Sequence, residues 1–385
     1  MDAKPDPPIS VQVVDPPAWT PPYDHALSAA LARAGAEVEL VTTEFPLTAV
    51  PAGDGYAVGE RFYRASSRLS GDSRGGPAVA ARRALKLAEH VPDMLAWRRH
   101  AKAADVVHLQ WLTFPVVDAR LLPRDRPLVF TAHDVPPREP RRGDLAALRR
   151  LLGTVDAVIV HSRYGARFLT DELKAPAERI HVVPHGVFDY LTRLPSERPL
   201  DGELAAVEGP VILFFGLLRS YKGLDVLLDA FRDVEGAELW IVGLPLLPLE
   251  ELEERARRAK GRVRFIPRFV DDDEVPALFR RADIVALPYR QIDQSGVLHV
   301  AMAFGTPLVL SRVGGFTELG EDHGAAVLVE PGDADGLRAA LQELVDDPDA
   351  RARLGAAAAA AAGRELSWDA VAERTLGIYR TVLGR

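Results

Sequence analysis

The chain contains no cysteine and no long apolar run. The absence of cysteine excludes disulfide bonds, thiolate zinc sites and a cysteine nucleophile. No apolar segment approaches the ~20 residues of a membrane span, and the polar, proline-rich first ten residues lack the apolar centre of a signal peptide. The net charge of −8 gives no general attraction to nucleic acid. We therefore expect a cytoplasmic protein that has no nucleic-acid partner.

What the chain does contain suits two ordinary globular domains. Of its 385 residues, 48% are hydrophobic and 26% are charged, which is typical of soluble proteins. At ~100–200 residues per domain, this length predicts two domains, each with enough chain for its own core.

Short apolar runs alternate with helical patterns in the first half. A loop with four prolines (residues 15–22) and a helical pattern (23–35) separate the first two runs. Such alternation predicts a mostly parallel, doubly wound α/β sheet. The predicted strands are residues 11–14, 38–42, 106–109, 128–131, 157–160 and 180–183.

The same alternation begins again at Val211, after a proline-rich linker at residues 188–210. Helices are predicted at residues 224–231, 337–345 and 367–383, and an alanine run at 356–362 favours a further helix. The predicted strands are residues 211–215, 238–242, 263–266, 284–287, 308–310 and 326–329.

The most informative turn lies between the strand at 211–215 and the helix at 224–231. Gly216 ends the strand, and Arg219 and Lys222, three residues apart, lie on the turn that opens the helix. A helix N-terminus favours anions, and two cations add to that preference. We interpret the turn as a site for a diphosphate, against the alternative of two solvated side chains. It is not a P-loop, because Gly-Lys-Ser/Thr is absent at the required spacing.

The segments around this turn resemble, in their order, the retaining glycosyltransferases of the GT-B fold, family 4. The resemblance runs from about Pro21 to the C-terminus and rests on short segments. They are Thr131-Ala132-His133-Asp134, Val183-Pro184-His185-Gly186-Val187, the turn itself, Gln294-Ser295-Gly296-Val297-Leu298, Gly305-Thr306-Pro307 and Val313-Gly314-Gly315-Phe316-Thr317-Glu318.

The resemblance implies two Rossmann-like domains, at residues 1–190 and 208–366, with helix 367–385 packing back on the first. Ligands of such α/β domains bind outside the carboxyl ends of the strands, so we expect a substrate in a cleft between the domains. His108, His133 and His185 are placed near strand ends by the pattern and are therefore candidates for this cleft.

The resemblance also implies roles for individual residues. His133 would contact a donor hydroxyl close to the reacting carbon, with a loop hydrogen bond as the alternative. Arg219 and Lys222 would neutralise the leaving diphosphate, so that neither a metal nor a cofactor is needed. Asp271-Asp272-Asp273 formally contains an Asp-x-Asp motif, but it precedes Glu274-Val275-Pro276 and reads as a helix cap.

The chain departs from the family at two glutamates that normally lie eight residues apart. Ile292 and Val300 occupy these positions. We expect Asp293 to supply the sugar-binding carboxylate, and His299 is a weak candidate for the ribose contact. The backbone N–H groups of the adjacent turn are expected to hold donor oxygens. The donor-binding residues of this group are Gly216, Asp293, Gln294, Ser295, Gly296 and Val297.

Further candidates are expected at the edges of the substrate site. Glu318 would border the donor, Arg268 the nucleobase and Tyr23 an acceptor sugar, while His108 is expected in the cleft. The alternatives are an acid in the first turn of a helix for Glu318, a surface arginine for Arg268 and a packed loop for Tyr23. A basic cluster gives a possible peripheral membrane contact or a solvated face. It comprises Arg138, Arg141, Arg142, Arg149 and Arg150.

The sequence thus predicts a glycosyltransferase that moves a sugar from a nucleotide diphosphate sugar to an acceptor hydroxyl with retention of configuration. The acceptor is a saccharide, a lipid-linked or a small molecule. The alternatives are an epimerase or phosphorylase of the same fold and a silent sugar-nucleotide-binding protein. A nicotinamide dehydrogenase is disfavoured because Gly-x-Gly-x-x-Gly is absent.

Overall fold

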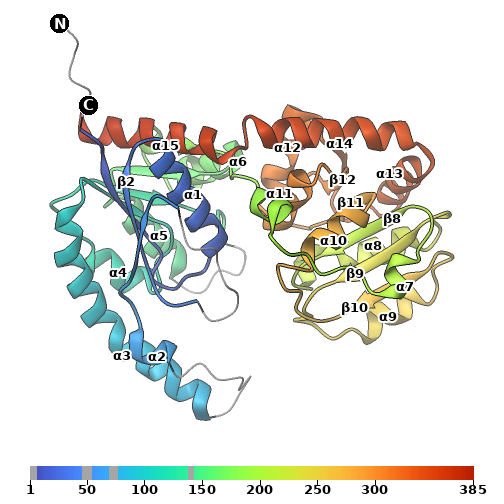
Figure 1. Ribbon diagram of the computed structural model, residues 1–385, viewed down its shortest axis with the longest axis horizontal. Coiled ribbons are helices and arrows are strands. Elements are labelled where there is room, and N and C mark those ends of the chain that lie inside the picture. The colour runs from blue at the N-terminus through green and yellow to red at the C-terminus, as the bar shows by residue number, and fades with distance from the viewer. Residues whose placement is uncertain (1–6, 46–53, 69–76, 138–142) are drawn as a thin grey trace, which may run out of the picture. The chain divides into compact units, whose positions relative to one another are not determined.

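The chain divides into two compact units in a computed structural model that describes residues 7–45, 54–68, 77–137 and 143–385 (Figure 1). The N-terminal unit comprises Met1–His161, Gly165–Pro184 and Trp368–Arg385. The C-terminal unit comprises Ser162–Tyr164 and His185–Ser367. The chain therefore leaves the N-terminal unit, forms the other unit, and returns with its last helix.

A parallel sheet of seven strands forms the centre of the N-terminal unit, in the order β3-β2-β1-β4-β5-β6-β7. Its central strands are buried from end to end, as expected for a parallel sheet covered on both faces. The strands are β1 Ser10–Val14, β2 Glu37–Thr42, β3 Ala57–Glu60, β4 Val106–Leu109, β5 Leu128–Thr131, β6 Ala157–Val160 and β7 Ile180–Val182.

Two apolar layers cover this sheet. One contains Trp97 and Leu151 and underlies α3, α4 and α5; the other contains Tyr23 and Trp368 and joins α1 to α15, which lie side by side (Figure 1). The helices are α1 Pro21–Arg33, α2 Arg64–Ser67, α3 Pro77–His100, α4 Pro115–Leu121, α5 Asp144–Leu152 and α15 Trp368–Leu383, while α6 Arg163–Arg167 lies where the chain passes between units.

A second parallel sheet, of six strands in the order β10-β9-β8-β11-β12-β13, forms the centre of the C-terminal unit. Its strands are β8 Val211–Phe215, β9 Glu238–Val242, β10 Val263–Ile266, β11 Ile284–Leu287, β12 Leu308–Ser311 and β13 Ala326–Val329. Its helices are α7 Gly202–Ala205, α8 Leu224–Phe231, α9 Glu250–Ala256, α10 Val275–Arg281, α11 Gly296–Ala303, α12 Gly314–His323, α13 Ala334–Asp346 and α14 Pro348–Gly363.

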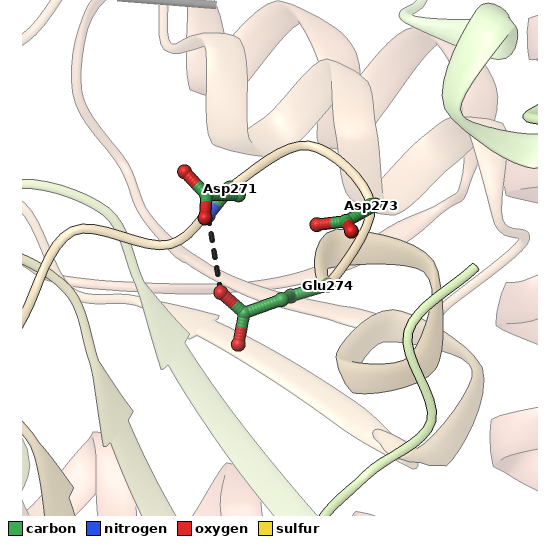
Figure 2. Close-up of side chains that lie close together, drawn as sticks. All are labelled: Asp271, Asp273 and Glu274. Atoms are coloured by element: carbon green, nitrogen blue, oxygen red, sulfur yellow. Dashed lines mark hydrogen bonds between the residues drawn. The ribbon is translucent and has the colours of Figure 1, made fainter. Parts of the chain in front are cut away.

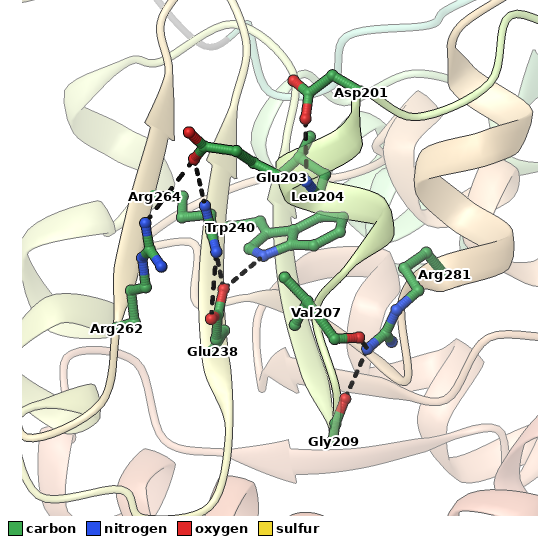
Figure 3. Close-up of polar contacts among 10 residues, drawn as sticks. All are labelled: Asp201, Glu203, Leu204, Val207, Gly209, Glu238, Trp240, Arg262, Arg264 and Arg281. Atoms are coloured by element: carbon green, nitrogen blue, oxygen red, sulfur yellow. Dashed lines mark hydrogen bonds and ion pairs between the residues drawn. The ribbon is translucent and has the colours of Figure 1, made fainter.

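A polar network fastens the start of this unit to its sheet (Figure 3). Arg281, on α10, donates to the carbonyl oxygens of Val207 and Gly209 at 2.9 and 2.7 Å. Arg264 pairs with Glu238 across β10 and β9 at 2.7 Å. The bonds from Arg281 satisfy backbone groups of the segment that enters β8, so the strand carrying the Gly216 turn has a fixed starting point.

The fold class is as predicted: two doubly wound, parallel α/β units. The elements that were not predicted include the exposed edge strand β3 and the long helix α3. The linker at 188–210 holds short helices at Asp189–Arg193 and Gly202–Ala205. No helix in the described residues has the length and apolarity to cross a bilayer. Arg138, Arg141 and Arg142 of the basic cluster lie outside the described residues.

Candidate active site

The turn after β8 brings two backbones unusually close. Gly216 has a φ of +99°, in the region that favours glycine. The neighbouring strand β9 ends at Gly243, where a Cβ atom would lie 2.0 Å from the carbonyl oxygen of Gly216. Both positions therefore require glycine, and the carboxyl end of β8 presents bare backbone.

Lys222 lies directly over this bare backbone. Its side chain is buried, and its Nζ is 3.0 Å from the point that a Cβ atom on Gly216 would occupy. A methyl group of Val297, in the first turn of α11, is 3.1 Å from the same point. An ammonium and a helix N-terminus thus converge on the end of β8, which is the arrangement that favours a phosphate group.

Two residues after β11 hold this lysine turn in place. The ring of Tyr289 lies 5.2 Å from Lys222 Nζ, within the range of a cation–π contact. Arg290 donates to the carbonyl oxygen of Ser220 at 3.1 Å and forms a bidentate pair with Asp225 at 2.8 and 2.6 Å. The turn between β8 and α8 is therefore tied to the neighbouring strand end.

Arg219 lies on the same turn but lines a different space from the one beside Gly216. It is half-buried, and it borders an open pocket of about 520 Å³. Acidic residues of α8 and α9, among them Asp225 and Glu251, share this pocket. Arg219 thus lies at the rim of the turn, whereas Lys222 is buried beside Gly216. That both cations face one ligand stays a prediction.

The loop that leads into α11 is packed against the start of α12. A Cβ on Gly314 would lie 1.8 Å from the carbonyl oxygen of Ile292, and one on Gly315 would lie 2.3 Å from Nε2 of Gln294. His299 contacts the Gln294 side-chain oxygen through Nε2 at 3.1 Å, and its ring stacks on that of His185. Residues 292–297 are therefore preorganised by the Gly-Gly start of α12.

Asp293 is buried in this loop. Its carboxylate accepts a hydrogen bond from the hydroxyl of Ser162, and its carbonyl oxygen accepts from the N–H of Gly315 at 3.1 Å. The carboxylate therefore has a protein contact in addition to any contact with a sugar.

Two further candidates make contacts that account for them structurally. Glu318 accepts from the backbone N–H groups of Arg163 and Tyr164 at 2.8 and 2.7 Å, so it caps α6. Arg268 forms a bidentate pair with Glu274 at 2.9 and 2.6 Å. Glu318, on α12, thus caps a neighbouring helix, and Arg268 makes an exposed ion pair; the substrate contacts expected of both residues stay predictions.

His133 lies at the carboxyl end of β5, within a group of aromatic rings. Its ring stacks on Trp111 at 5.1 Å and meets the edge of Tyr23 at 4.7 Å. Its Nδ1 contacts Nε2 of His161 at 3.1 Å, and its Nε2 contacts the side-chain oxygen of Gln110 at 2.9 Å. The ring orientation is therefore fixed on both faces and at both nitrogens.

The tautomer of His161 follows from its contact with the backbone of Val183. The carbonyl oxygen of Val183 can only accept, so His161 carries its proton on Nδ1, which is 3.0 Å away. Burial lowers the pKa of His161 to about 4, so the ring is neutral and its Nε2 accepts.

The structure places His108 in the core of the N-terminal unit, and its predicted contact with substrate stays a prediction. It lies inside β4 and is fully buried, with Nδ1 2.6 Å from the hydroxyl of Tyr379 and Nε2 2.7 Å from that of Thr131. Both ring nitrogens are used within the core. Tyr23 is likewise buried, packed edge-on against His133 and Trp368, so it supports His133 rather than lining a site.

The acidic group at residues 271–274 is already paired with cations. Asp271, Asp273 and Glu274 lie close together (Figure 2), near enough to hold a metal ion. Arg198 lies within 3.5, 3.1 and 3.1 Å of them, and Arg268 pairs with Glu274. Because arginine supplies the opposite charge here, the group reads as an ion-pair network at the start of α10.

Several residues that shape the site carry no local signal in the sequence. Tyr289 and Arg290 follow β11, and their partners are about 65–70 residues away. Gly243 gives the only available signal, a glycine at the end of a predicted strand. Gln110 and Trp111 follow β4 in the same way, at the strand ends where ligands of parallel sheets bind.

Two family models match the chain. The model described as "Glycosyltransferase Family 4" matches residues 23–188, and the one described as "Glycosyl transferases group 1" matches residues 209–347. A D-inositol 3-phosphate glycosyltransferase of Xylanimonas cellulosilytica is 31% identical over 93% of this chain and 90% of its own length. The MMP alpha-(1->4)-mannosyltransferase of Mycolicibacterium hassiacum is 31% identical over 67% of this chain and 66% of its own length.

Solved structures share the whole fold. A sucrose-phosphate synthase from Thermosynechococcus elongatus matches 98% of this chain and 99% of its own, with a TM-score of 0.72 and 19% identity. Anabaena Alr3699/HepE in complex with UDP matches 97% of this chain and 100% of its own, with a TM-score of 0.71 and 19% identity. The same arrangement of two parallel-sheet units is therefore found in these proteins.

Proposed function

The chain belongs to glycosyltransferase family 4, and on this basis we propose that it transfers a sugar from a nucleoside diphosphate sugar to an acceptor hydroxyl with retention of configuration. The observation that carries the proposal is the position of Lys222: a buried ammonium beside the bare backbone of Gly216 and the first turn of α11. Structures of Anabaena HepE hold UDP and UDP-glucose, which supports a nucleotide sugar as donor.

The proposed chemistry is a displacement at the anomeric carbon. The bond from that carbon to the diphosphate oxygen breaks, and a bond to the acceptor oxygen forms on the same face of the sugar. The departing phosphate oxygen takes the acceptor proton, so no side chain acts as a nucleophile. Lys222 and Arg219 stabilise the charge that develops on the diphosphate, and each such contact contributes about 10²–10³ in rate.

The α11 loop is the proposed contact for the rest of the donor. Gly296 and Val297 present N–H groups of the first turn of α11, where the helix itself supplies no acceptor. Asp293 precedes them and is the proposed carboxylate for the sugar hydroxyls. His133 keeps the role that the family resemblance gives it, a contact to a donor hydroxyl, and we propose that catalysis needs neither metal nor cofactor.

The test is binding and turnover in variants of the lysine turn. Lys222→Gln should weaken UDP binding, measured by calorimetry, and lower kcat/KM for the donor by about 10²–10³. Arg219→Gln should act in the same direction but less, because its side chain lies at the rim. Arg257→Gln, which alters an exposed ion pair on α9, is the matched control.

Product analysis separates the alternatives. Acceptor-dependent release of nucleoside diphosphate is expected of a transferase. An epimerase would convert the donor without acceptor, a phosphorylase would require inorganic phosphate, and a silent binder would release nothing. Wild-type UDP binding and rates in Lys222→Gln would place the diphosphate elsewhere and refute the proposal.

A further inference from the structure

A second pocket lies in the N-terminal unit, apart from the residues assigned to the donor. It is open, has a volume of about 310 Å³, and is bordered by the segments that follow β1 and β2. These are carboxyl ends of parallel strands, where ligands of such sheets bind. Its lining residues include Trp19, Thr43, Tyr63, Arg82, Arg83 and Lys86.

Three cations on α3 give this pocket its charge. Arg82, Arg83 and Lys86 all line it, and no carboxylate among the described residues forms an ion pair with any of them. Lys86 lies over the ring of Tyr63, with Nζ 4.4 Å from the ring centroid. The lining of this pocket therefore holds three cations and one carboxylate, that of Glu44.

Acidic groups also lie near the pocket, and they offset part of its charge. Glu44 lines the pocket but is exposed and makes no ion pair with the three cations. Asp15 is buried, and burial raises its pKa; its carboxyl group hydrogen-bonds that of Asp24, whose pKa burial also raises. Burial and the nearby charge of Arg82 lower the pKa of Lys86, whereas Asp15 opposes that change. An anion from outside would relieve the repulsion among the three cations.

The pocket is connected to His133 by aromatic rings. Trp19 lines the pocket with 56% of its surface exposed. Its ring meets that of Trp111 edge-on at 5.1 Å, and Trp111 stacks on His133 at 5.1 Å. Exposed indole rings offer an apolar face to a sugar ring, while the cations take an anionic group.

We infer that this pocket binds the phosphate group of the acceptor, so that the acceptor is a phosphorylated sugar or polyol, or a lipid with a phosphate headgroup. Three cations around one small space match the charge of a phosphate monoester, which is close to −2 at neutral pH. A volume of about 310 Å³ is at the small end of ligand sites. The identification of the ligand as the acceptor rests on the proposed function. The presence of an anion site in this pocket does not.

The experiment measures binding with the donor site saturated by UDP, so that Lys222 cannot contribute. The probes are glucose 6-phosphate, glucose, and vesicles of phosphatidylcholine with or without phosphatidic acid. We compare wild type with the double variant Arg82→Gln/Lys86→Gln. The matched control is Arg98→Gln/Arg99→Gln, two cations further along α3 that line another pocket.

Wild type and the control should be stabilised by glucose 6-phosphate, in a thermal-shift assay, and not by glucose. The double variant should bind glucose 6-phosphate at least about tenfold more weakly, since charge-assisted contacts are lost, while its UDP binding is unchanged. Vesicle binding that needs phosphatidic acid and is lost in the double variant would assign the phosphate to a lipid headgroup and also support the site.

Equal binding of a phosphate probe by the double variant and the control would overturn the inference, as would no binding of either phosphate probe. The proposed function fails in a different way. If no acceptor, phosphorylated or not, gives release of nucleoside diphosphate, but phosphate binding that depends on Arg82 and Lys86 persists, the transferase assignment is refuted and the anion site remains.

Discussion

Acidification should destabilise the N-terminal unit through two buried histidines. Burial lowers the pKa of His108 to about 3 and that of His161 to about 4, against an ordinary value of 6.5. Below pH 6.5 the unfolded chain binds protons at these rings and the folded chain does not. The stability they contribute is therefore fully present above pH 6.5 and is lost as the pH falls towards their folded pKa values.

The size of the effect follows from the pKa differences. One pKa unit corresponds to about 1.36 kcal/mol. Between pH 8 and pH 5, about 1.5 units are crossed below the unfolded value, so each ring removes about 2 kcal/mol from the free energy of unfolding. His108 and His161 together remove about 4 kcal/mol, a large fraction of ordinary domain stability.

The assay is urea unfolding at the two pH values, followed by tryptophan fluorescence. Trp19, Trp97, Trp111 and Trp368 lie in the N-terminal unit, so the signal reports mainly on it. In His108→Gln, the fall between pH 8 and pH 5 should be about 2 kcal/mol smaller than in wild type. Comparing the two chains cancels the opposite contribution of the raised Asp15 and Asp24 carboxyl groups.

His323→Gln, which alters a histidine at the end of α12 in the other unit, should change the fall in neither direction. A His108→Gln chain that retains the whole wild-type fall would refute the burial argument. Donor and acceptor KM should also be unchanged in this variant at pH 8, because His108 contacts only the core. A large effect of His108→Gln on KM would instead support the predicted substrate contact of His108.

Three further predictions concern the donor site. Arg290→Met removes the bonds that tie the lysine turn to the end of β11, and it should raise the donor KM about tenfold through the loss of charge-assisted bonds. Arg312→Met, which removes another exposed ion pair, should leave the donor KM unchanged. Equal donor KM values in these two variants would contradict a positioning role for Arg290. Activity should persist in excess EDTA, and a loss reversed by Mg²⁺ would return attention to the acidic group of Figure 2. Asp293→Asn should impair use of the intact donor more than UDP binding, and Ser162→Ala less than Asp293→Asn; equal effects of the two variants on donor use would leave Asp293 with only its structural contact.

The buried strands could be predicted because each is a short, continuous apolar run, as parallel sheets require. β3 could not, because Ala57–Glu60 lies at the sheet edge and is largely exposed. α3 mixes alanine with arginine and contains Pro92, which obscures helical periodicity. Buried elements produce a clear apolar pattern in the sequence. Exposed elements produce little of this pattern and are therefore hard to predict.

The closeness of Lys222 to Gly216 was predictable, because one short turn carries both residues. The site was not predictable where contacts join distant segments. His108 lies near a strand end, and only the return of α15 shows that Tyr379, 271 residues away, takes its ring nitrogen. Spacing along the chain places a residue on a strand but does not reveal what covers it.

The return of the last helix has a consequence for biosynthesis. α15 completes the layer around Tyr23 and His108, yet the ribosome makes it only after the whole C-terminal unit, which ends at Ser367. At ~5–20 residues per second, the early half waits on the order of ten to forty seconds for its last element. During that time the face of α1 that meets Trp368 is uncovered, so slower translation lengthens the exposure of this apolar surface on the nascent chain.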